Sequence, residues 1–153
     1  MSSVGDYMNT RMVIRDTKAT VLEVAKAMTD WNISSVAITD DKGENVVGML
    51  TERDIVRNTA KNLLSGRITA GSLMSTPVVS VKSDMPIEDA ARLMLNKKVR
   101  HLIVEDAKRV VGIITTTDLA RYLKKRASLA KGTPASPVES PDPLLSEVWE
   151  LYF

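Results

Sequence analysis

The sequence contains no cysteine, which excludes disulfide bonds, thiol catalysis and zinc sites built from cysteine. It contains a single histidine, so metal sites that need two spaced histidines are excluded as well. A glycine-rich phosphate loop of the Walker type is also missing. Together these absences predict a protein that is not an enzyme and that holds no metal.

Long apolar runs are missing too, since no stretch approaches the roughly 20 residues that span a membrane, and the first residues do not resemble a signal peptide. We therefore expect a cytoplasmic protein with no membrane partner. The net charge is only +2, and residues 1–125 carry 19 basic and 15 acidic side chains. This slight basic excess suits a phosphate-bearing ligand and is too weak to indicate nucleic-acid binding by itself.

One motif is written twice. VVGMLTERDIVR begins at Val46 and VVGIITTTDLAR begins at Val110, and both contain Val-Val-Gly-x-x-Thr-x-x-Asp followed by an arginine. Upstream of these motifs the two halves also align, with Gly5 on Gly71. The alignment predicts an internal duplication, with repeat 1 at residues 1–66, repeat 2 at residues 67–126 and a separate tail at residues 127–153.

Each half has the same pattern of apolar periodicity. Short strands are expected at residues 11–15, 35–39 and 46–50 and again at residues 77–82, 101–105 and 110–114, with helices between and after them. Thr20-x-x-Glu23 is typical of a capping box, and the helix after it has an apolar stripe that includes Val21, Leu22 and Val24. One β-α-β-β-α unit of about 55 residues buries little surface alone. We therefore expect a mixed α/β (α+β) fold of two repeats, packed through their sheets with pseudo-two-fold symmetry.

The duplicated Gly-h-h-Thr-x-x-Asp motif, together with the strand segment VRHLIVED at Val99–Asp106, resembles a tandem pair of cystathionine-β-synthase (CBS) domains, also called a Bateman module. The resemblance covers about 125 of the 153 residues. It implies a stand-alone regulatory module that senses AMP, ADP or ATP, forms a homodimer and signals ligand occupancy to a partner by a conformational or dimer change. S-adenosylmethionine or NAD would satisfy the same recognition of ribose and adenine.

The Thr-x-x-Asp turn suits a nucleotide for chemical reasons. A helix N-terminus offers free N–H groups to phosphate, and the hydroxyls of Thr51, Thr115 and Thr117 can donate to phosphate or accept from ribose. An ionised aspartate only accepts, so Asp54 and Asp118 suit the two ribose hydroxyls. The alternative interpretation is a plain helix cap, because threonine followed by an acidic residue stabilises a helix without any ligand.

Positive charge must face the phosphates of such a ligand. Arg100 and His101 in repeat 2 and Arg53 in repeat 1 are the candidates, although a lone histidine beside a strand is also a common structural residue. Arg57 and Arg121 instead follow each aspartate by three residues, a spacing that favours an ion pair along the helix. The resemblance further implies that backbone groups hold the adenine, at Val13, Ile14, Ser34, Val79, Val81 and Val99.

Two other possibilities stay open. Lys97, Lys98 and Arg100 could contact nucleic acid, but no aromatic residues lie between them, and solvated charge is the simpler explanation. In the tail, the proline-rich stretch GTPASPVESPDP precedes LLSEVWELYF, whose apolar residues share one helical face. Leu144–Phe153 therefore docks either on this chain or its dimer mate, or on another protein.

Overall fold

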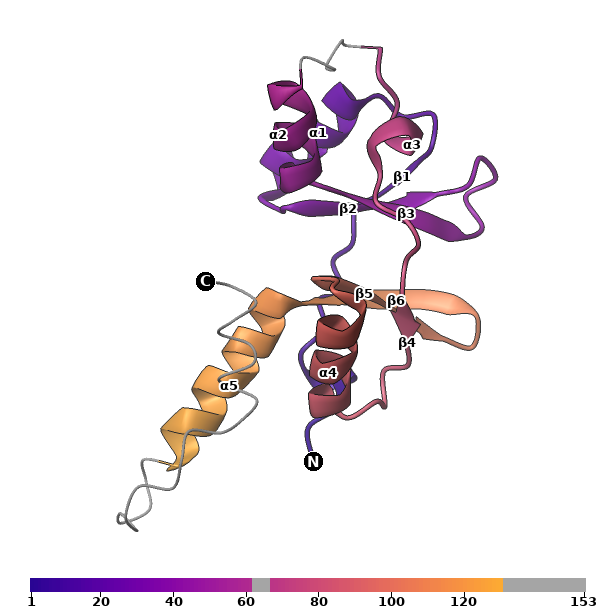
Figure 1. Ribbon diagram of the computed structural model, residues 1–153. Coiled ribbons are helices and arrows are strands. Elements are labelled where there is room, and N and C mark those ends of the chain that lie inside the picture. The colour runs from indigo at the N-terminus through magenta and orange to yellow at the C-terminus, as the bar shows by residue number, and fades with distance from the viewer. Residues whose placement is uncertain (62–66, 131–153) are drawn as a thin grey trace. The chain divides into compact units, whose positions relative to one another are not determined.

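A computed structural model describes residues 1–61 and 67–130 (Figure 1). The chain divides into two compact units. The first-repeat unit is Arg11–Val78, and the second-repeat unit combines Met1–Thr10 with the chain that begins at Val79. These boundaries differ from those of the sequence repeats, because the first ten residues pack with repeat 2. The apolar segment Leu144–Phe153 lies outside the described residues.

The first-repeat unit is a three-stranded sheet with helices. The sheet has the order β1-β2-β3, with β1 (Ile14–Asp16) parallel and β3 (Val46–Thr51) antiparallel to the central β2 (Ser35–Thr39). Helix α1 (Val21–Trp31) connects β1 to β2, α2 (Glu52–Ala60) follows β3, and the short α3 (Ala70–Leu73) comes later in the chain (Figure 1).

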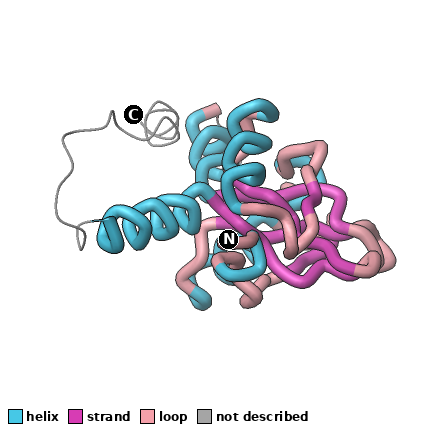
Figure 2. Tube along the Cα trace, turned by 90° about the horizontal axis from the view of Figure 1, so that it is seen from below, coloured by secondary structure: helices cyan, strands magenta, loops and turns pink. Residues whose placement is uncertain are grey.

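The second-repeat unit repeats this plan. Its sheet has the order β4-β5-β6, with β4 (Ser80–Val81) parallel and β6 (Arg109–Thr115) antiparallel to β5 (His101–Asp106). Helix α4 (Ile87–Lys97) connects β4 to β5, α5 (Thr116–Ala130) follows β6, and a 3₁₀ turn, η1 (Val4–Asp6), lies near the N-terminus. Beyond the strands of its unit, α5 continues as one long helix (Figure 2). The β-α-β-β-α order predicted for each half is confirmed.

Alternation along the strands builds the cores. In the first-repeat unit, Val36 and Ile38 of β2 pack with Val24 and Met28 of α1. The equivalent core of the second-repeat unit contains Leu102 and Val104 of β5, Ile114 of β6, and Ile87 and Met94 of α4. The expected capping box between Thr20 and Glu23 is present at the start of α1. The inward placement of Leu22 was wrong, since its side chain is 68% exposed. Neighbouring residues on a helix point about 100° apart, and Val21 takes the inward direction.

Each unit is completed by the first residues of the other repeat. In the second-repeat unit, the amide of Asn9 donates to the Ile113 carbonyl at 2.8 Å, and the Ile113 amide donates to the Asn9 carbonyl at 3.0 Å. In the first-repeat unit, Ser75 and Met49 exchange the same two bonds, at 2.7 and 3.1 Å. Helix starts depend on these segments too. The first amide of α4 donates to the Ser2 carbonyl because Pro86, at the cap position, has no side-chain hydrogen-bonding group. We call residues 2–10 and 68–76 the exchanged segments.

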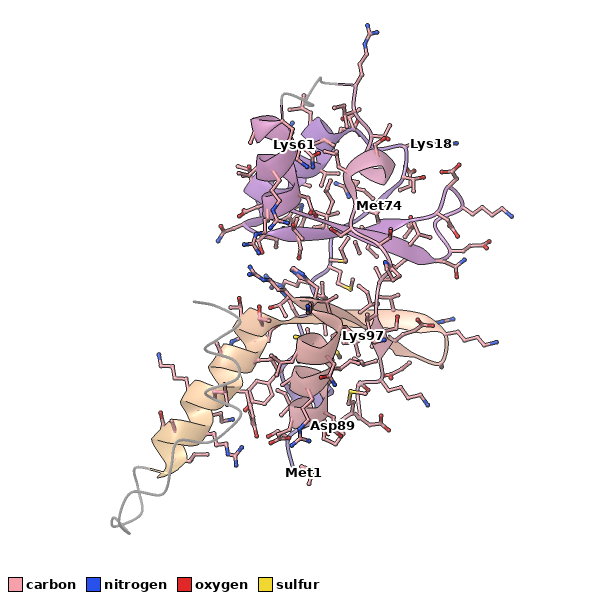
Figure 3. All side chains as sticks on the ribbon, in the orientation of Figure 1. Met1, Lys18, Lys61, Met74, Asp89 and Lys97 are labelled. Carbon is pink, nitrogen blue, oxygen red and sulfur yellow. The ribbon has the colours of Figure 1, made fainter. Side chains whose placement is uncertain are left out.

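The glycine of the repeated motif makes this close approach possible. A Cβ atom on Gly112 would lie 2.9 Å from the carbonyl oxygen of Asn9 and 2.9 Å from the sulfur of Met8. A Cβ atom on Gly48 would lie 2.5 Å from the sulfur of Met74, which Figure 3 labels. The glycine in Gly-h-h-Thr-x-x-Asp is therefore explained by packing of the exchanged segments.

We expect Gly112→Ala to lower the free energy of unfolding by about 1–3 kcal/mol, the usual cost of overpacking, because the new methyl group meets backbone. Gly48→Ala should cost less, since its methyl group meets only the flexible side chain of Met74. Urea unfolding monitored by circular dichroism measures both. Alanine in place of glycine ordinarily stabilises a strand, so an unchanged or raised stability of Gly112→Ala would contradict the close approach.

Candidate functional site

The turn between β3 and α2 is a reciprocal cap. The Thr51 hydroxyl accepts a hydrogen bond from the Asp54 amide at 3.2 Å. Oδ2 of Asp54 accepts two bonds in return, from the Thr51 amide and the Thr51 hydroxyl, both at 3.0 Å. The structural interpretation of Thr-x-x-Asp therefore applies to this copy, with the aspartate closing the capping box.

The turn between β6 and α5 repeats the two bonds to the carboxylate. Oδ2 of Asp118 accepts from the Thr115 amide at 2.9 Å and from the Thr115 hydroxyl at 3.0 Å. Asp118 is 4% exposed, so its carboxylate is held deep in the turn. In both copies the cap uses Oδ2, and the second carboxylate oxygen, Oδ1, points out of the cap to other partners.

The partners of Oδ1 differ between the copies. Oδ1 of Asp118 accepts from the Arg121 guanidinium at 2.7 Å, which confirms the predicted ion pair. Oδ1 of Asp54 accepts instead from the Ser75 hydroxyl at 3.1 Å. The same spacing predicted a pair with Arg57, which is not among the bonds described for this carboxylate. Ser75 lies 21 residues from Asp54 in sequence, on an exchanged segment, so no local pattern could indicate it.

Strand register brings other predicted residues beside the turns. His101 lies opposite Thr115 on the neighbouring strand, as Ser35 lies opposite Thr51. The carbonyl of Arg100 accepts from the first amide of α5 at 3.1 Å, and the carbonyl of Ser34 accepts from the first amide of α2 at 3.0 Å. Arg100 and Ser34 are exposed and His101 is half-buried. The start of the central strand therefore lies beside the turn in each unit.

Backbone groups of the edge strands reach the same end of each sheet. The carbonyl of Val13 accepts from the Ala37 amide at 3.2 Å, and that of Val79 accepts from the Ile103 amide at 2.9 Å. Because backbone direction alternates along a strand, the amides of Ile14 and Ser80 face the outer edge of their sheets. In each sheet the edge strand and the central strand start at the same end, and the antiparallel third strand finishes there, at the turn. The backbone groups of the edge strand therefore lie two strand spacings, about 10 Å, from the turn. The side chains of Val81 and Val99 pack in or against the core of the second-repeat unit.

The family model of the CBS domain matches this chain twice, at residues 4–61 and 70–125. The chain belongs to the CBS-domain family. Its relative YhcV, a CBS domain-containing protein of Bacillus subtilis, is 35% identical over 121 residues, which are 78% of this chain and 84% of YhcV. The uncharacterized protein MK0525 of Methanopyrus kandleri is 34% identical over 119 residues, which cover 76% of this chain and 60% of MK0525.

A solved CBS domain pair has a similar fold. It belongs to protein MJ0100, and its crystal structure is a complex with 5′-methylthioadenosine and S-adenosyl-L-methionine. The similarity has a TM-score of 0.73 at 26% identity and covers 82% of this chain and 98% of that one. The predicted resemblance to a tandem CBS pair, with two repeats of mixed α and β structure, is confirmed.

The two CBS turns differ in the residues between threonine and aspartate. In repeat 2, Thr116 is 7% exposed and its amide is already bonded, so Thr117, which is exposed, is the hydroxyl available to a ligand. In repeat 1, the corresponding residues are Glu52 and Arg53, both exposed. The first turn therefore presents one charge of each sign at the helix start, whereas the second presents a neutral hydroxyl.

A surface groove lies at the far end of the first CBS sheet. It is lined by the β2–β3 hairpin and the residues that follow β1, among them Thr17, Asp40, Asp41 and Glu44. The acidic lining disfavours phosphate, and the turn with Asp54 is at the opposite end of β3. Among residues 1–61 and 67–130, no group of three or more potential metal ligands of the His, Cys, Asp and Glu types is found. The helices described in those ranges are all too short or too polar to cross a lipid bilayer.

Helix α5, which begins at the second turn, is fixed to the rest of its unit by Tyr122. The Tyr122 hydroxyl donates a hydrogen bond to the Glu88 carboxylate at the start of α4. Arg126 lies 3.7 Å from the same carboxylate, and the Tyr7 ring packs edge-on against Tyr122 at 5.3 Å between centroids. The Tyr122 hydrogen bond holds the pKa of Glu88 below its usual value, while burial and then Glu88 raise the pKa of Tyr122. Sequence periodicity did not indicate this polar contact between Tyr122, Glu88 and Arg126, which we call the clasp.

The two pKa directions define a pH window for the clasp. A lowered Glu88 pKa gives stability that is present above its unfolded value, about 4.3, and is lost as pH falls through the folded pKa. A raised Tyr122 pKa gives stability that is present below about pH 10 and is lost as pH rises through the folded pKa. We therefore expect Tyr122→Phe to lower the free energy of unfolding by about 1–2 kcal/mol at pH 7 and by less at pH values outside this window.

Urea unfolding at several pH values measures this difference. Tyr7→Phe is the control, because it keeps the ring that packs on Tyr122 and leaves the hydrogen bond to Glu88 in place. A Tyr122→Phe defect that stays constant from neutral to acid pH would show that packing, rather than the hydrogen bond, connects α5 to α4.

Proposed function

We propose that this CBS pair is a regulatory module that binds an adenosine-containing ligand at its Thr-x-x-Asp turns. AMP, ADP and ATP are the leading ligands, and S-adenosylmethionine and NAD are the alternatives. The module catalyses no reaction in this proposal, since each aspartate is already engaged by its cap. It acts by passing ligand occupancy to another protein.

The observation that carries the proposal is that the two oxygens of each carboxylate have different partners. Oδ2 of Asp54 and of Asp118 accepts two cap bonds, while Oδ1 is bonded to a single side chain that a ligand can displace. An oxygen of this kind accepts from ribose hydroxyls without loss of the cap. The nearby threonine hydroxyl and the outward backbone of the edge strand are then available to other parts of a nucleoside.

The comparison with MJ0100 supports the class of ligand. Methylthioadenosine and S-adenosylmethionine share one adenosine group and differ in what is attached to its 5′ carbon, so a CBS pair of this fold accommodates adenine and ribose. Transfer of that property to this chain is part of the proposal.

Local charge favours a phosphate over a sulfonium at the 5′ carbon. Lys97, Lys98 and Arg100 lie within four residues of one another just before β5, and all three are exposed. Their positive charges attract phosphate and repel the sulfonium of S-adenosylmethionine. Arg53, exposed in the first turn of α2, adds a cation on the other repeat.

In this proposal the output passes through a second protein or a second copy of this chain. We propose a homodimer whose geometry responds to the ligand, with the apolar residues of Leu144–Phe153 as a contact for a partner. Coupling of this kind requires that the ligand bind the two states with different affinity.

We expect at least one of AMP, ADP and ATP to bind the wild-type protein in calorimetric titration. Asp118→Asn and Asp54→Asn each remove a charged acceptor, while the one remaining amide oxygen can still accept the cap bonds from the threonine. Loss of a hydrogen bond to a carboxylate should weaken binding at the affected turn about 10- to 100-fold. S-adenosylmethionine and NAD are titrated alongside.

Asp89→Asn is the matched control. Asp89 also lies in the first turn of a helix and pairs with an arginine three residues later, Arg92 (Figure 3). It should leave nucleotide binding unchanged. The proposal is rejected if no adenosine compound binds, or if both aspartate variants bind as the wild type does.

A further inference from the structure

The side chains bonded to the outer carboxylate oxygens are of different kinds. Arg121 donates to Oδ1 of Asp118 from within the same helix, and its side chain is 64% exposed while that of Asp118 is 6% exposed. Ser75 donates to Oδ1 of Asp54 from the exchanged segment, and two backbone bonds to Met49 hold the Ser75 backbone in position. One donor is a charged group and the other is a neutral hydroxyl.

Both donors are bonded to the oxygen that would accept a ribose hydroxyl in the proposed binding mode. Oδ2 of each aspartate already accepts two bonds from threonine, so the oxygen with capacity for a ligand is Oδ1. A group bonded there must move aside or share the oxygen when a ribose arrives. The free protein therefore loses part of an existing interaction each time it binds.

We propose that Ser75 and Arg121 are internal competitors of the ligand, one at each turn, and that they set different affinities and salt responses for the two turns. This inference rests on the proposed function, since it concerns the same carboxylates. Arg121 shields the charge of Asp118 through an ion pair that is open to solvent on the arginine side, so salt weakens the competitor. Ser75 competes through an uncharged donor, and salt leaves it unchanged.

The test uses proteins in which only one turn can bind. Asp54→Asn leaves the second turn, and Arg121→Ala is added to it. Asp118→Asn leaves the first turn, and Ser75→Ala is added to that protein. Adenosine and AMP are titrated by calorimetry at about 0.05 M and about 0.5 M salt, conditions of weak and strong screening. Adenosine has no phosphate, so it reports on the ribose contact without a second salt-dependent interaction.

Removal of either competitor should tighten adenosine binding about two- to fivefold, the range expected for a solvent-exposed pair or a single neutral donor. The gain from Arg121→Ala should shrink at high salt, and the gain from Ser75→Ala should persist. A purely structural role for either residue would weaken binding or leave it unchanged, and it would not produce this difference in salt response.

Two variants control for general effects. Arg92→Ala removes an arginine of the same exposure and the same ion-pair spacing, 65% exposed and paired with Asp89, and Ser72→Ala removes an exposed serine near Ser75. Neither should change binding. This inference alone is overturned if Ser75→Ala and Arg121→Ala leave adenosine binding to the single-turn proteins unchanged or make it weaker. Failure of both single-turn proteins to bind adenosine or AMP overturns the proposed function, and this inference with it.

Discussion

The structure depends on the reciprocal bonding of the exchanged segments to β3 and β6. Each repeat alone has a three-stranded sheet with an edge strand of only two or three residues, and a unit of this size buries only about 60% of the surface that its unfolded chain exposes. The first residues of each repeat are used by the other unit, where they cap a helix and extend the pairing of a strand. The second-repeat unit therefore needs the first ten residues of the chain, whereas the first-repeat unit is one continuous stretch, Arg11–Val78.

Much of each unit could be predicted from the sequence because the deciding interactions are local. The Thr20–Glu23 box, the Thr-x-x-Asp caps and the Asp118–Arg121 pair all join residues three positions apart, and strand periodicity requires only neighbouring residues. The exchange could not be predicted, since the two halves are so alike that residues 2–10 match the chemistry of either repeat. Ser75 was missed for the same reason, because its bond to Asp54 exists only after the exchange has placed it there.

The two interpretations of the Thr-x-x-Asp turn are compatible. Sequence reasoning set a helix cap against a ribose ligand as alternatives, yet a carboxylate has two oxygens and the cap uses one of them. The cap fixes the orientation of the other oxygen, so in the proposed function the structural role of Oδ2 would prepare Oδ1 for a ligand. Preorganisation of this kind lowers the cost of binding, because the acceptor is already in place before the ligand arrives.

Duplication gave the two turns the same cap, and they differ mainly at the outer oxygen. A change of donor there, from the Arg121 guanidinium to the Ser75 hydroxyl, leaves the helix start intact while it alters what a ligand must displace. The position of the donor also matters. Arg121 is one turn along its own helix, so its displacement stays local, whereas Ser75 belongs to the segment on which completion of the first-repeat unit depends. If the proposed ligand binds at Asp54, it would act on an element that connects the two repeats along the chain, which would make the first turn the better placed of the two to convert occupancy into a signal.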